Sequence, residues 1–402
     1  MGLRLFEIFF DKPQKVFSPG ETISGRVKVI LDSPKKIRGL EFCCKGLAHT
    51  SWSESETVTG VDGKREQRNV EYRGDEEYFK IKYYLVGGKD QEMELPPGEH
   101  IYPFVCVLPP VLPSSFEGSK GYIRYTVKAT LDRPWKFDHT TEVAITVISE
   151  LDLNATPHLK ETVTMTLEKY FCCLWCKSGP LLVEVFLPCS GYVPGQTITM
   201  NCNVDNASNV DINKITFTLK QKITFRSVFP SRHTHVNQTD IAFKSYSTPI
   251  PAKENRNFVE EIIVPSIPPS NLTNCSLIDL DYELKVEANV TGLHSNLTSK
   301  IPITIGTIPL QQGSNYVASA PSGHVAVDIN NLPKNLQNPT IGWVAPTVGD
   351  APVYPPPYPT APNDLPPPYP ADNSGNQSNN FSTDPGFKPL YPVYTFPNAP
   401  NS

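Results

Sequence analysis

The sequence predicts an all-β protein: two tandem immunoglobulin-type β-sandwiches followed by a disordered, proline-rich tail. Three observations support this prediction. Apolar and polar residues alternate in many short segments, one sequence element recurs far along the chain, and the composition changes abruptly after Ile308. Alternation with a period of two is typical of strands that bury one face. Long apolar runs at helical spacing are missing, so we expect antiparallel sheets up to that residue.

The alternation is clearest in two segments that lie in different halves of the chain. Residues 122–129 (YIRYTVKA) and residues 282–288 (YELKVEA) both place apolar and polar side chains on opposite faces. Turn-forming Pro, Gly, Asn and Asp bound such segments every 8–15 residues or so, a spacing typical of sandwiches. We therefore expect one half-buried strand in each segment.

An internal repeat indicates that the two sandwiches are copies of one unit. Residues 17–23 (FSPGETI) return as residues 192–198 (YVPGQTI). In each copy proline fixes φ at the first turn position and glycine supplies the positive φ of the next. Further along, Pro113-Ser114 matches Pro269-Ser270 at a smaller offset. The first copy therefore holds about 19 additional residues, which we place in a hairpin or loop within residues 51–75.

These boundaries define four regions. We expect a first sandwich over residues 1–150, a linker with the first strand of the second domain over 151–178, and a second sandwich over 179–308. The tail, residues 309–402, has 20 prolines and only seven charged residues, so it cannot bury enough apolar surface to offset its ordering entropy. We expect it to be disordered and partly polyproline II, and we expect the sandwiches to fold without it.

Two Pro-Pro-x-Tyr motifs lie in this tail, and they predict binding to WW domains. Consecutive prolines pre-form polyproline II, so two prolines can dock in an aromatic groove while the tyrosine fills the adjacent pocket. A third string at residues 391–394 (YPVY) lacks the paired prolines and is interpreted as background. The predicted WW-binding residues are Pro355, Pro356, Tyr358, Pro366, Pro367 and Tyr369.

In these features the chain resembles the α-arrestins, the arrestin domain-containing proteins. The resemblance is carried by residues 6–10 with 18–27, by the Pro194-Gly195 element, and by the paired tail motifs. It implies arrestin-like N and C domains and a non-enzymatic adaptor in the cytoplasm. Such an adaptor joins WW-domain-containing HECT-class ubiquitin ligases to transmembrane receptor or transporter cargo, and it associates peripherally with the plasma membrane and endosomes through that cargo.

Composition excludes several other classes. The chain has 402 residues and a net charge of −5, without the basic cluster that nucleic acid requires. Its stretches are too polar for a membrane helix, and its N-terminus lacks the pattern of a signal peptide. Motifs for nucleotide binding, hydrolysis or zinc catalysis are missing, so we expect neither enzymatic activity nor a cofactor. Several Asn-x-Ser/Thr triplets leave a secreted, glycosylated protein as an alternative.

The nine cysteines are odd in number and indicate reduced thiols. Cys172, Cys173 and Cys176 lie beside apolar residues and are candidates for palmitoylation; they offer too few ligands for zinc. By resemblance to the thioredoxin-interacting protein, Cys275 is a candidate redox contact, which makes a thioredoxin-binding regulator the alternative function. The pair at residues 233–235 (HTH) has no third ligand nearby in sequence and is interpreted as a solvated loop.

Overall fold

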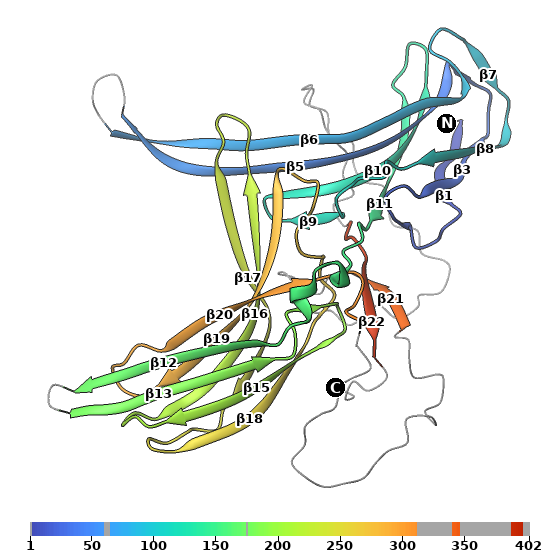
Figure 1. The fold of residues 1–402 in the computed structure, drawn as a ribbon. Helices are drawn as coiled ribbons and strands as arrows, with labels where there is room; N and C mark the ends of the chain where they lie inside the picture. Colours follow the sequence, from blue (N-terminus) through green and yellow to red (C-terminus); the bar gives the residue numbers. More distant parts are fainter. Residues whose placement is uncertain (1, 60–64, 174–175, 312–339, 346–386, 397–402) are drawn as a thin grey trace, which may run out of the picture.

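The computed structural model describes residues 2–59, 65–173, 176–311, 340–345 and 387–396. These residues are almost entirely β-structure, arranged as two elongated sandwiches with a short two-stranded ladder between them (Figure 1). The predicted fold class, two tandem β-sandwiches, is confirmed. Among the described residues, no helix has the length and apolar character needed to cross a membrane.

The N-terminal sandwich packs a three-stranded sheet, in the order β1-β3-β8, against a larger sheet in the order β2-β11-β10-β5-β6, with β9 beside β10. β4 and β7 form a separate small ladder at one end. The strands are β1 (Leu3–Phe10), β2 (Val16–Phe17), β3 (Thr22–Leu31), β4 (Lys35–Ile37), β5 (Gly39–Thr59), β6 (Arg65–Gly87), β7 (Met93–Leu95), β8 (Gly98–Val107), β9 (Phe116–Gly118), β10 (Gly121–Asp132) and β11 (His139–Val147).

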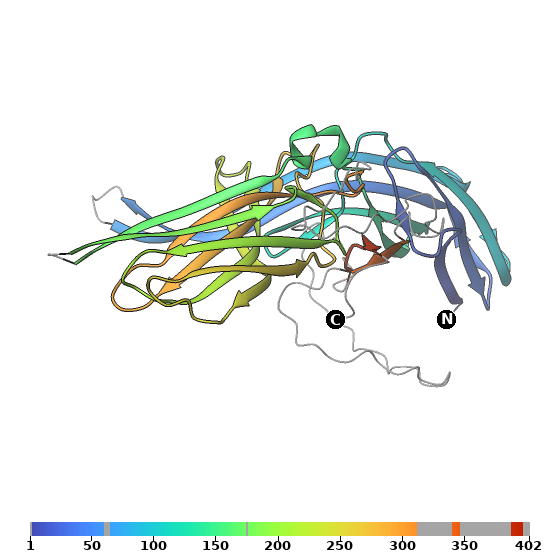
Figure 2. The ribbon, with the colours of Figure 1, turned by 60° about the horizontal axis from the view of Figure 1, so that its bottom comes forward.

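The C-terminal sandwich repeats this plan with a four-stranded sheet, β12-β13-β15-β18, and a five-stranded sheet, β14-β20-β19-β16-β17. Two short 3-10 helices connect the domains (Figure 2). The elements are η1 (Leu153–Ala155), η2 (Pro157–Lys160), β12 (Val163–Cys173), β13 (Cys176–Leu187), β14 (Gly191–Tyr192), β15 (Thr197–Asn206), β16 (Ile212–Arg226), β17 (Thr234–Tyr246), β18 (Asn255–Ile263), β19 (Ile278–Val290) and β20 (Leu297–Ile305).

The repeat is visible at the level of single hydrogen bonds. Gly20 and Gly195 have φ of 79° and 89°, as the turn requires. The hydroxyls of Tyr125 and Tyr282 donate to the carbonyls of Pro113 and Pro268, each at a distance of 2.7 Å. A serine hydroxyl two residues after each of these prolines then accepts from the last residue of β11 or β20, at 2.9 and 2.8 Å. The equivalent serines are therefore 115 and 270, one residue from the alignment that the sequence indicates.

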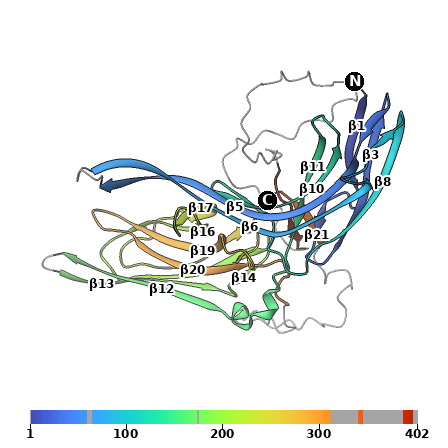
Figure 3. The same cartoon turned by 90° about the horizontal axis from the view of Figure 1, so that it is seen from above.

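The additional residues of the first copy lengthen the β5–β6 hairpin. The register of this ladder runs from Gly39↔Gly87 to Thr59↔Arg65, so β5 and β6 extend well past the rest of their sheet. Figure 3 shows the extension curving over the β16–β17 side of the C-terminal domain. The insertion within residues 51–75 is therefore the distal part of the β5–β6 hairpin, which extends from the N-terminal domain over the C-terminal domain.

The tail does not stay free of the body throughout, which corrects the prediction of a disordered region over residues 309–402. β21 (Thr340–Val344) and β22 (Tyr391–Thr395) pair as an antiparallel ladder. Figure 1 shows this ladder between the two sandwiches. Tyr391 and Tyr394 are 1% and 6% exposed, so residues 391–394 anchor this part of the tail to the body.

Candidate functional site: the junction between the domains

The long hairpin joins the two domains through backbone hydrogen bonds. Arg73 on β6 donates its N–H to the Phe229 carbonyl at 2.8 Å, and its own carbonyl accepts from Val228 and Phe229 at 2.9 Å. The Arg73 guanidinium also lies over the Phe229 ring, 5.0 Å from its centroid. Backbone pairing between domains fixes their relative position more tightly than side-chain contacts would, because neither partner has rotamer freedom.

Side chains continue this seam on both sides of Arg73. The Thr50 hydroxyl donates to the Arg226 carbonyl at 2.8 Å. The Glu76 carboxylate accepts from the backbone N–H and the hydroxyl of Ser276, at 2.9 and 2.8 Å. Gly74 leaves no room for a side chain, since a Cβ there would lie 2.8 Å from Leu277. The apolar cores of the two sandwiches form one continuous cluster, so the body is a single scaffold.

A polar and aromatic cluster closes the outer part of the seam. Glu54 on β5 accepts from His233 Nε2 and His235 Nδ1, each at 3.1 Å, and from Trp52 Nε1 at 3.0 Å. The His233 ring stacks on Tyr72, with centroids 4.5 Å apart. The interpretation of the histidine pair as a solvated loop is therefore wrong, because its partner carboxylate lies in the other domain.

The charge of Glu54 is stabilised by this arrangement. The hydrogen bond from His235 makes the largest contribution to lowering the pKa of the Glu54 carboxyl. The electrostatic field and the hydrogen bond of His233 add to it, and together they hold this pKa below its usual range. Because the carboxyl group ionises more easily in the folded protein, its contact contributes stability at pH values above the ordinary pKa of glutamate. The two histidines thus fix the distal hairpin to the C-terminal domain at neutral pH.

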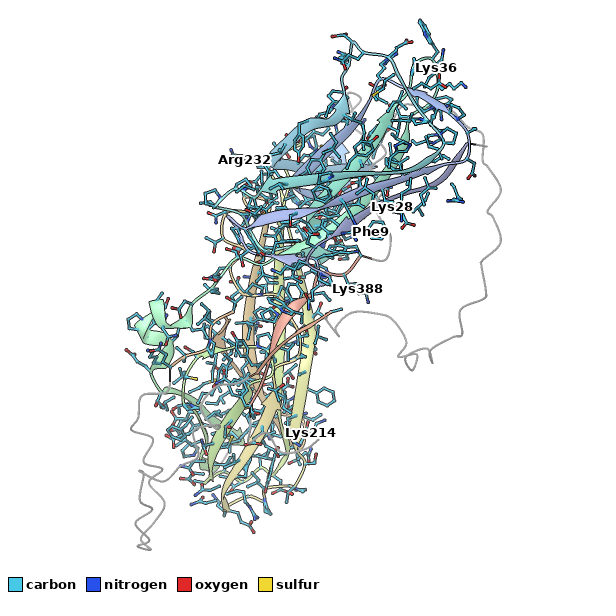
Figure 4. All side chains as sticks on the ribbon, turned by 90° about the vertical axis from the view of Figure 1, so that its right-hand side faces the viewer. Phe9, Lys28, Lys36, Lys214, Arg232 and Lys388 are labelled. Carbon is cyan, nitrogen blue, oxygen red and sulfur yellow. The ribbon has the colours of Figure 1, made fainter. Side chains whose placement is uncertain are left out.

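The C-terminal strand β22 binds both domains at the junction. On the N-terminal side, the Tyr391 hydroxyl donates to the Ser115 carbonyl at 3.0 Å, and Leu390 N–H donates to Thr146 Oγ1 at 3.2 Å. Its Tyr391 ring is fully enclosed. Figure 4 shows Lys388, just before this strand, at the waist between the two domains. The tail segment therefore returns to the body after the intervening residues.

On the C-terminal side, Tyr394 packs against the repeated turn. Its N–H donates to the Pro194 carbonyl at 2.9 Å, and its hydroxyl donates to the Thr307 carbonyl. A Cβ on Gly195 would lie only 2.0 Å from the Tyr394 carbonyl oxygen, so glycine at this position permits the approach as well as the turn. The equivalent Gly20 meets nothing closer than 3.8 Å. One copy of the turn has therefore become a docking place for the tail.

The partner strand β21 is also attached to the body. The Ser266 hydroxyl donates to the Val344 carbonyl at 2.8 Å, and Trp343 lines an open hollow of about 260 Å³ together with Pro392 and Tyr394. In the ladder Val344 pairs with Tyr391, so the segment between these two residues leaves the body and returns to it at the same point of the junction. Both predicted WW-binding motifs belong to that intervening stretch.

The residues predicted from the sequence are distributed differently. Pro355, Pro356, Tyr358, Pro366, Pro367 and Tyr369 lie outside the described residues. Cys172, Cys173 and Cys176 fall at the paired ends of β12 and β13, where the backbone alone is described. Within the described ranges, no group of three or more His, Cys, Asp or Glu is arranged to hold a metal ion.

Cys275 is a partly buried free thiol near the seam. Burial raises the pKa of the Cys275 thiol, and its Sγ accepts the Ile278 N–H at 3.3 Å. A raised pKa lowers the thiolate fraction, which is the reactive form. This environment disfavours a redox contact at Cys275.

Two repeated sandwiches, each with a Pro-Gly turn and linked by the long β5–β6 hairpin, are the architecture of the arrestins. Residues 6–154 match the family model for the N-terminal domain of arrestin (or S-antigen), and residues 177–310 match that for the C-terminal domain. The chain is 33% identical over 310 residues to arrestin domain-containing protein 17 of Caenorhabditis elegans, covering 76% of this chain and 70% of the relative.

Other relatives carry the same family name. The chain is 29% identical over 311 residues to arrestin domain-containing protein 1 of Rattus norvegicus, which covers 77% of this chain and 66% of that protein. It is 30% identical over 308 residues to arrestin domain-containing protein 4 of Mus musculus, at 75% and 71% coverage. The chain belongs to the arrestin family as an arrestin domain-containing protein. Its homologues support an arrestin-like adaptor family.

Proposed function

We propose that this protein is an adaptor that brings WW-domain HECT-class ubiquitin ligases to membrane-protein cargo. Its two motifs bind the ligase, its sandwiches bind a receptor or transporter, and the cargo is ubiquitinated, internalised and sorted through endosomes. The protein itself needs no catalytic group or cofactor for this role. It works in the cytoplasm, at the plasma membrane and at endosomes.

The observation that carries the proposal is the placement of the two strands that bracket the motifs. β21 ends before the first motif and β22 begins after the second, and both are held at the junction of one continuous scaffold. Whatever binds between them is tethered at both ends to the junction. That arrangement supports an adaptor with separate ligase and cargo surfaces.

The spacing of the motifs supports simultaneous binding of two WW domains. Tyr358 and Tyr369 are 11 residues apart, about 34 Å if the segment is polyproline II and about 18 Å as a flexible coil. A WW domain of roughly 35 residues has a diameter on the order of 20 Å. Two domains therefore fit when the intervening residues are extended, and Pro359 and Pro362 favour that state. Bivalent binding would raise avidity by roughly 10²–10⁴.

The test is titration calorimetry of the full chain against a single WW domain and against a tandem WW protein. Tyr358→Ala or Tyr369→Ala should weaken tandem binding sharply, and the double change should abolish it. Binding to the single domain should fall about twofold for either change, since one equivalent motif remains. Tyr354→Ala is the matched control, because this tyrosine lies in the same stretch without the paired prolines before it.

The division of labour is tested in cells. Removing residues 346–386 while keeping β21 and β22 should abolish co-precipitation of the ligase and leave co-precipitation of cargo intact. Loss of both together would show that the ligase and cargo surfaces are not separate. Retained ligase binding in the double tyrosine variant would show that the motifs are not the ligase site.

A further inference from the structure

The turn between β10 and β11 exposes two large aromatic side chains. This turn, residues 133–138, is called the aromatic tip. Trp135 is 94% exposed and Phe137 is 96% exposed, whereas most aromatic side chains of the sandwiches are buried or half-buried. Figure 1 shows β10 and β11 running away from the junction to the far end of the N-terminal domain, and Figure 4 shows Lys36, on the neighbouring β4, at the same end.

The backbone of the tip makes tryptophan an unfavourable choice for structure alone. Trp135 follows Pro134 and has φ of 58°, a left-handed conformation that glycine and asparagine adopt readily and bulky residues rarely do. Its indole is almost fully in solvent, so packing does not compensate for this strain. Strained positions of this kind are concentrated where a side chain meets a partner.

Two cations, Arg133 and Lys136, line the same open hollow as Trp135 and Phe137. Lys36, Arg133 and Lys136 lie on the tip or on β4 beside it, and Lys35 Nζ lies 3.1 Å from His139 Nε2. His139 Nε2 also contacts the Arg133 guanidinium. Burial, and then the fields of Lys35 and Arg133, lower the pKa of His139, which favours the neutral ring.

Two acids, Asp138 and Glu94, lie among these cations. Asp138 Oδ1 accepts the Arg133 backbone N–H at 3.0 Å, and Glu94 pairs across the β4–β7 ladder with Lys36. Four cations against these two carboxylates leave an excess of positive charge. The pKa of Lys35 is lowered by burial and then by repulsion from Arg133 and Lys136, which marks a positive field that an anion would relieve.

We propose that the aromatic tip inserts into the headgroup region of a bilayer that contains anionic lipids. Tryptophan and phenylalanine partition to the membrane interface, where the apolar ring leaves water. The surrounding Lys and Arg would stay at the phosphate level, as long cationic side chains do. An open hollow of about 720 Å³ between the aromatic and basic side chains of residues 133–139 has room for lipid headgroups.

The geometry favours a lipid surface over a protein partner. A peptide-binding site encloses its ligand in a groove, whereas Trp135 and Phe137 project with nearly their whole surface free. The projecting Trp135 and Phe137 rings, with Arg133 and Lys136 beside them, match a fluid, negatively charged surface instead. This contact is independent of the WW-binding motifs, so its failure would leave the proposed ligase recruitment intact.

The experiment is co-sedimentation of the full chain with phosphatidylcholine vesicles, with and without phosphatidylserine. Binding should require phosphatidylserine and should fall with added salt, because exposed charges are screened. Trp135→Ala with Phe137→Ala should weaken binding more than tenfold, from the lost transfer of two apolar rings. Lys36→Gln or Lys136→Gln should each weaken it about fivefold, as expected for one cation near an anionic surface.

Two variants separate membrane contact from folding. Trp135→Gly should match or exceed the native melting temperature, because glycine relieves the positive φ, and yet lose vesicle binding. Phe243→Ala is the matched control, since this ring is 74% exposed and lies on the C-terminal domain, away from the aromatic tip, and it should bind as the native chain does. A blue shift of tryptophan emission on binding should disappear with Trp135.

Four results would overturn the proposal. The native chain would fail to bind vesicles that contain phosphatidylserine, or the double aromatic variant would bind as well as Phe243→Ala. Alternatively, inorganic phosphate alone would compete as effectively as the vesicles, which would reduce the site to a simple anion contact. If the tip is needed to capture an acidic cargo peptide but not vesicles, it is a protein-binding surface instead.

Discussion

Replacing Gly195 by alanine should detach the C-terminal strand from the body, whereas the same change at Gly20 should not. The two glycines occupy equivalent turns and share positive φ, so both variants suffer the same backbone strain of about 1 kcal/mol. Only at Gly195 would the added Cβ meet the tail, 2.0 Å from the carbonyl oxygen of Tyr394. This atom belongs to the backbone, so the strand itself must move.

The magnitude follows from what Tyr394 would lose. Its ring is 6% exposed, and burial of such a side chain is worth about 1.5–3 kcal/mol. The hydrogen bond from its N–H to Pro194 adds about 1 kcal/mol. We therefore expect Gly195→Ala to cost about 2–4 kcal/mol more than Gly20→Ala, or several degrees of melting temperature at roughly 2–4 °C per kcal/mol. The total docking free energy of the strand is the upper limit.

The assay combines thermal unfolding with hydrogen exchange of the peptide that contains residues 391–395. Gly195→Ala should remove protection from this peptide, and Gly20→Ala should leave it protected. The same two variants are then made in a chain that ends at residue 386. Without β22 the excess cost of Gly195→Ala should vanish, because the clash has no second partner.

The truncated pair decides whether the reasoning holds. If Gly195→Ala remains several degrees less stable than Gly20→Ala in the shortened chain, the excess cost comes from the turn and not from the tail. If the 391–395 peptide keeps its protection in full-length Gly195→Ala, the strand accommodates the methyl group and the steric argument is wrong.

Three further changes test other parts of the junction. Tyr391→Phe should cost about 1 kcal/mol in unfolding, because it removes only the hydrogen bond to Ser115. Because its pKa is lowered in the folded protein, Glu54 contributes stability at pH values above the ordinary glutamate pKa, and this stability is lost as the pH falls through the lower folded value. Hydrogen exchange of residues 226–235 should therefore rise below about pH 4. Glu54→Gln should remove that pH dependence. Gly74→Val should loosen the seam, because its side chain would overlap Leu277, and the melting temperature should fall.

Each of these has a control within the chain. Tyr391→Ala should cost more than Tyr391→Phe, and equal costs would mean that the ring contributes nothing. Glu56→Gln leaves the two histidines paired with Glu54, so an equal loss of pH dependence would assign the effect elsewhere. Gly88→Ala meets nothing closer than 4.0 Å, and a melting temperature as low as that of Gly74→Val would make backbone freedom the cause.

Much of the fold could be predicted because it depends on local patterns. Alternation in residues 122–129 places Tyr125 and Val127 on the buried face of β10, where both have no exposed surface. The two Pro-Gly turns carry their geometry in their own residue types. The excess of residues over 51–75 located the long hairpin, although nothing in its sequence says which surface it crosses.

The junction could not be predicted because its partners are far apart in sequence. Glu54 and His233 are separated by 179 positions, and no periodicity links them. The tail strands were missed because their proline-rich surroundings dominate the composition. A signal was present: residues 390–396 (LYPVYTF) gather five large apolar side chains in a stretch with few charges, as residues 340–344 (TIGWV) do on a smaller scale.

The pairing of Val344 with Tyr391 also sets a limit on reach. The first motif begins 11 residues after Val344, so it can lie at most about 40 Å from that anchor. The second motif ends 22 residues before Tyr391, which limits it to about 75 Å from the same place. Under the proposed function, a ligase bound to the motifs would be confined to a region centred on the waist of the body. Ubiquitin transfer would then reach cargo lysines only within that radius plus the ligase's own length, whichever end of the scaffold the cargo occupies.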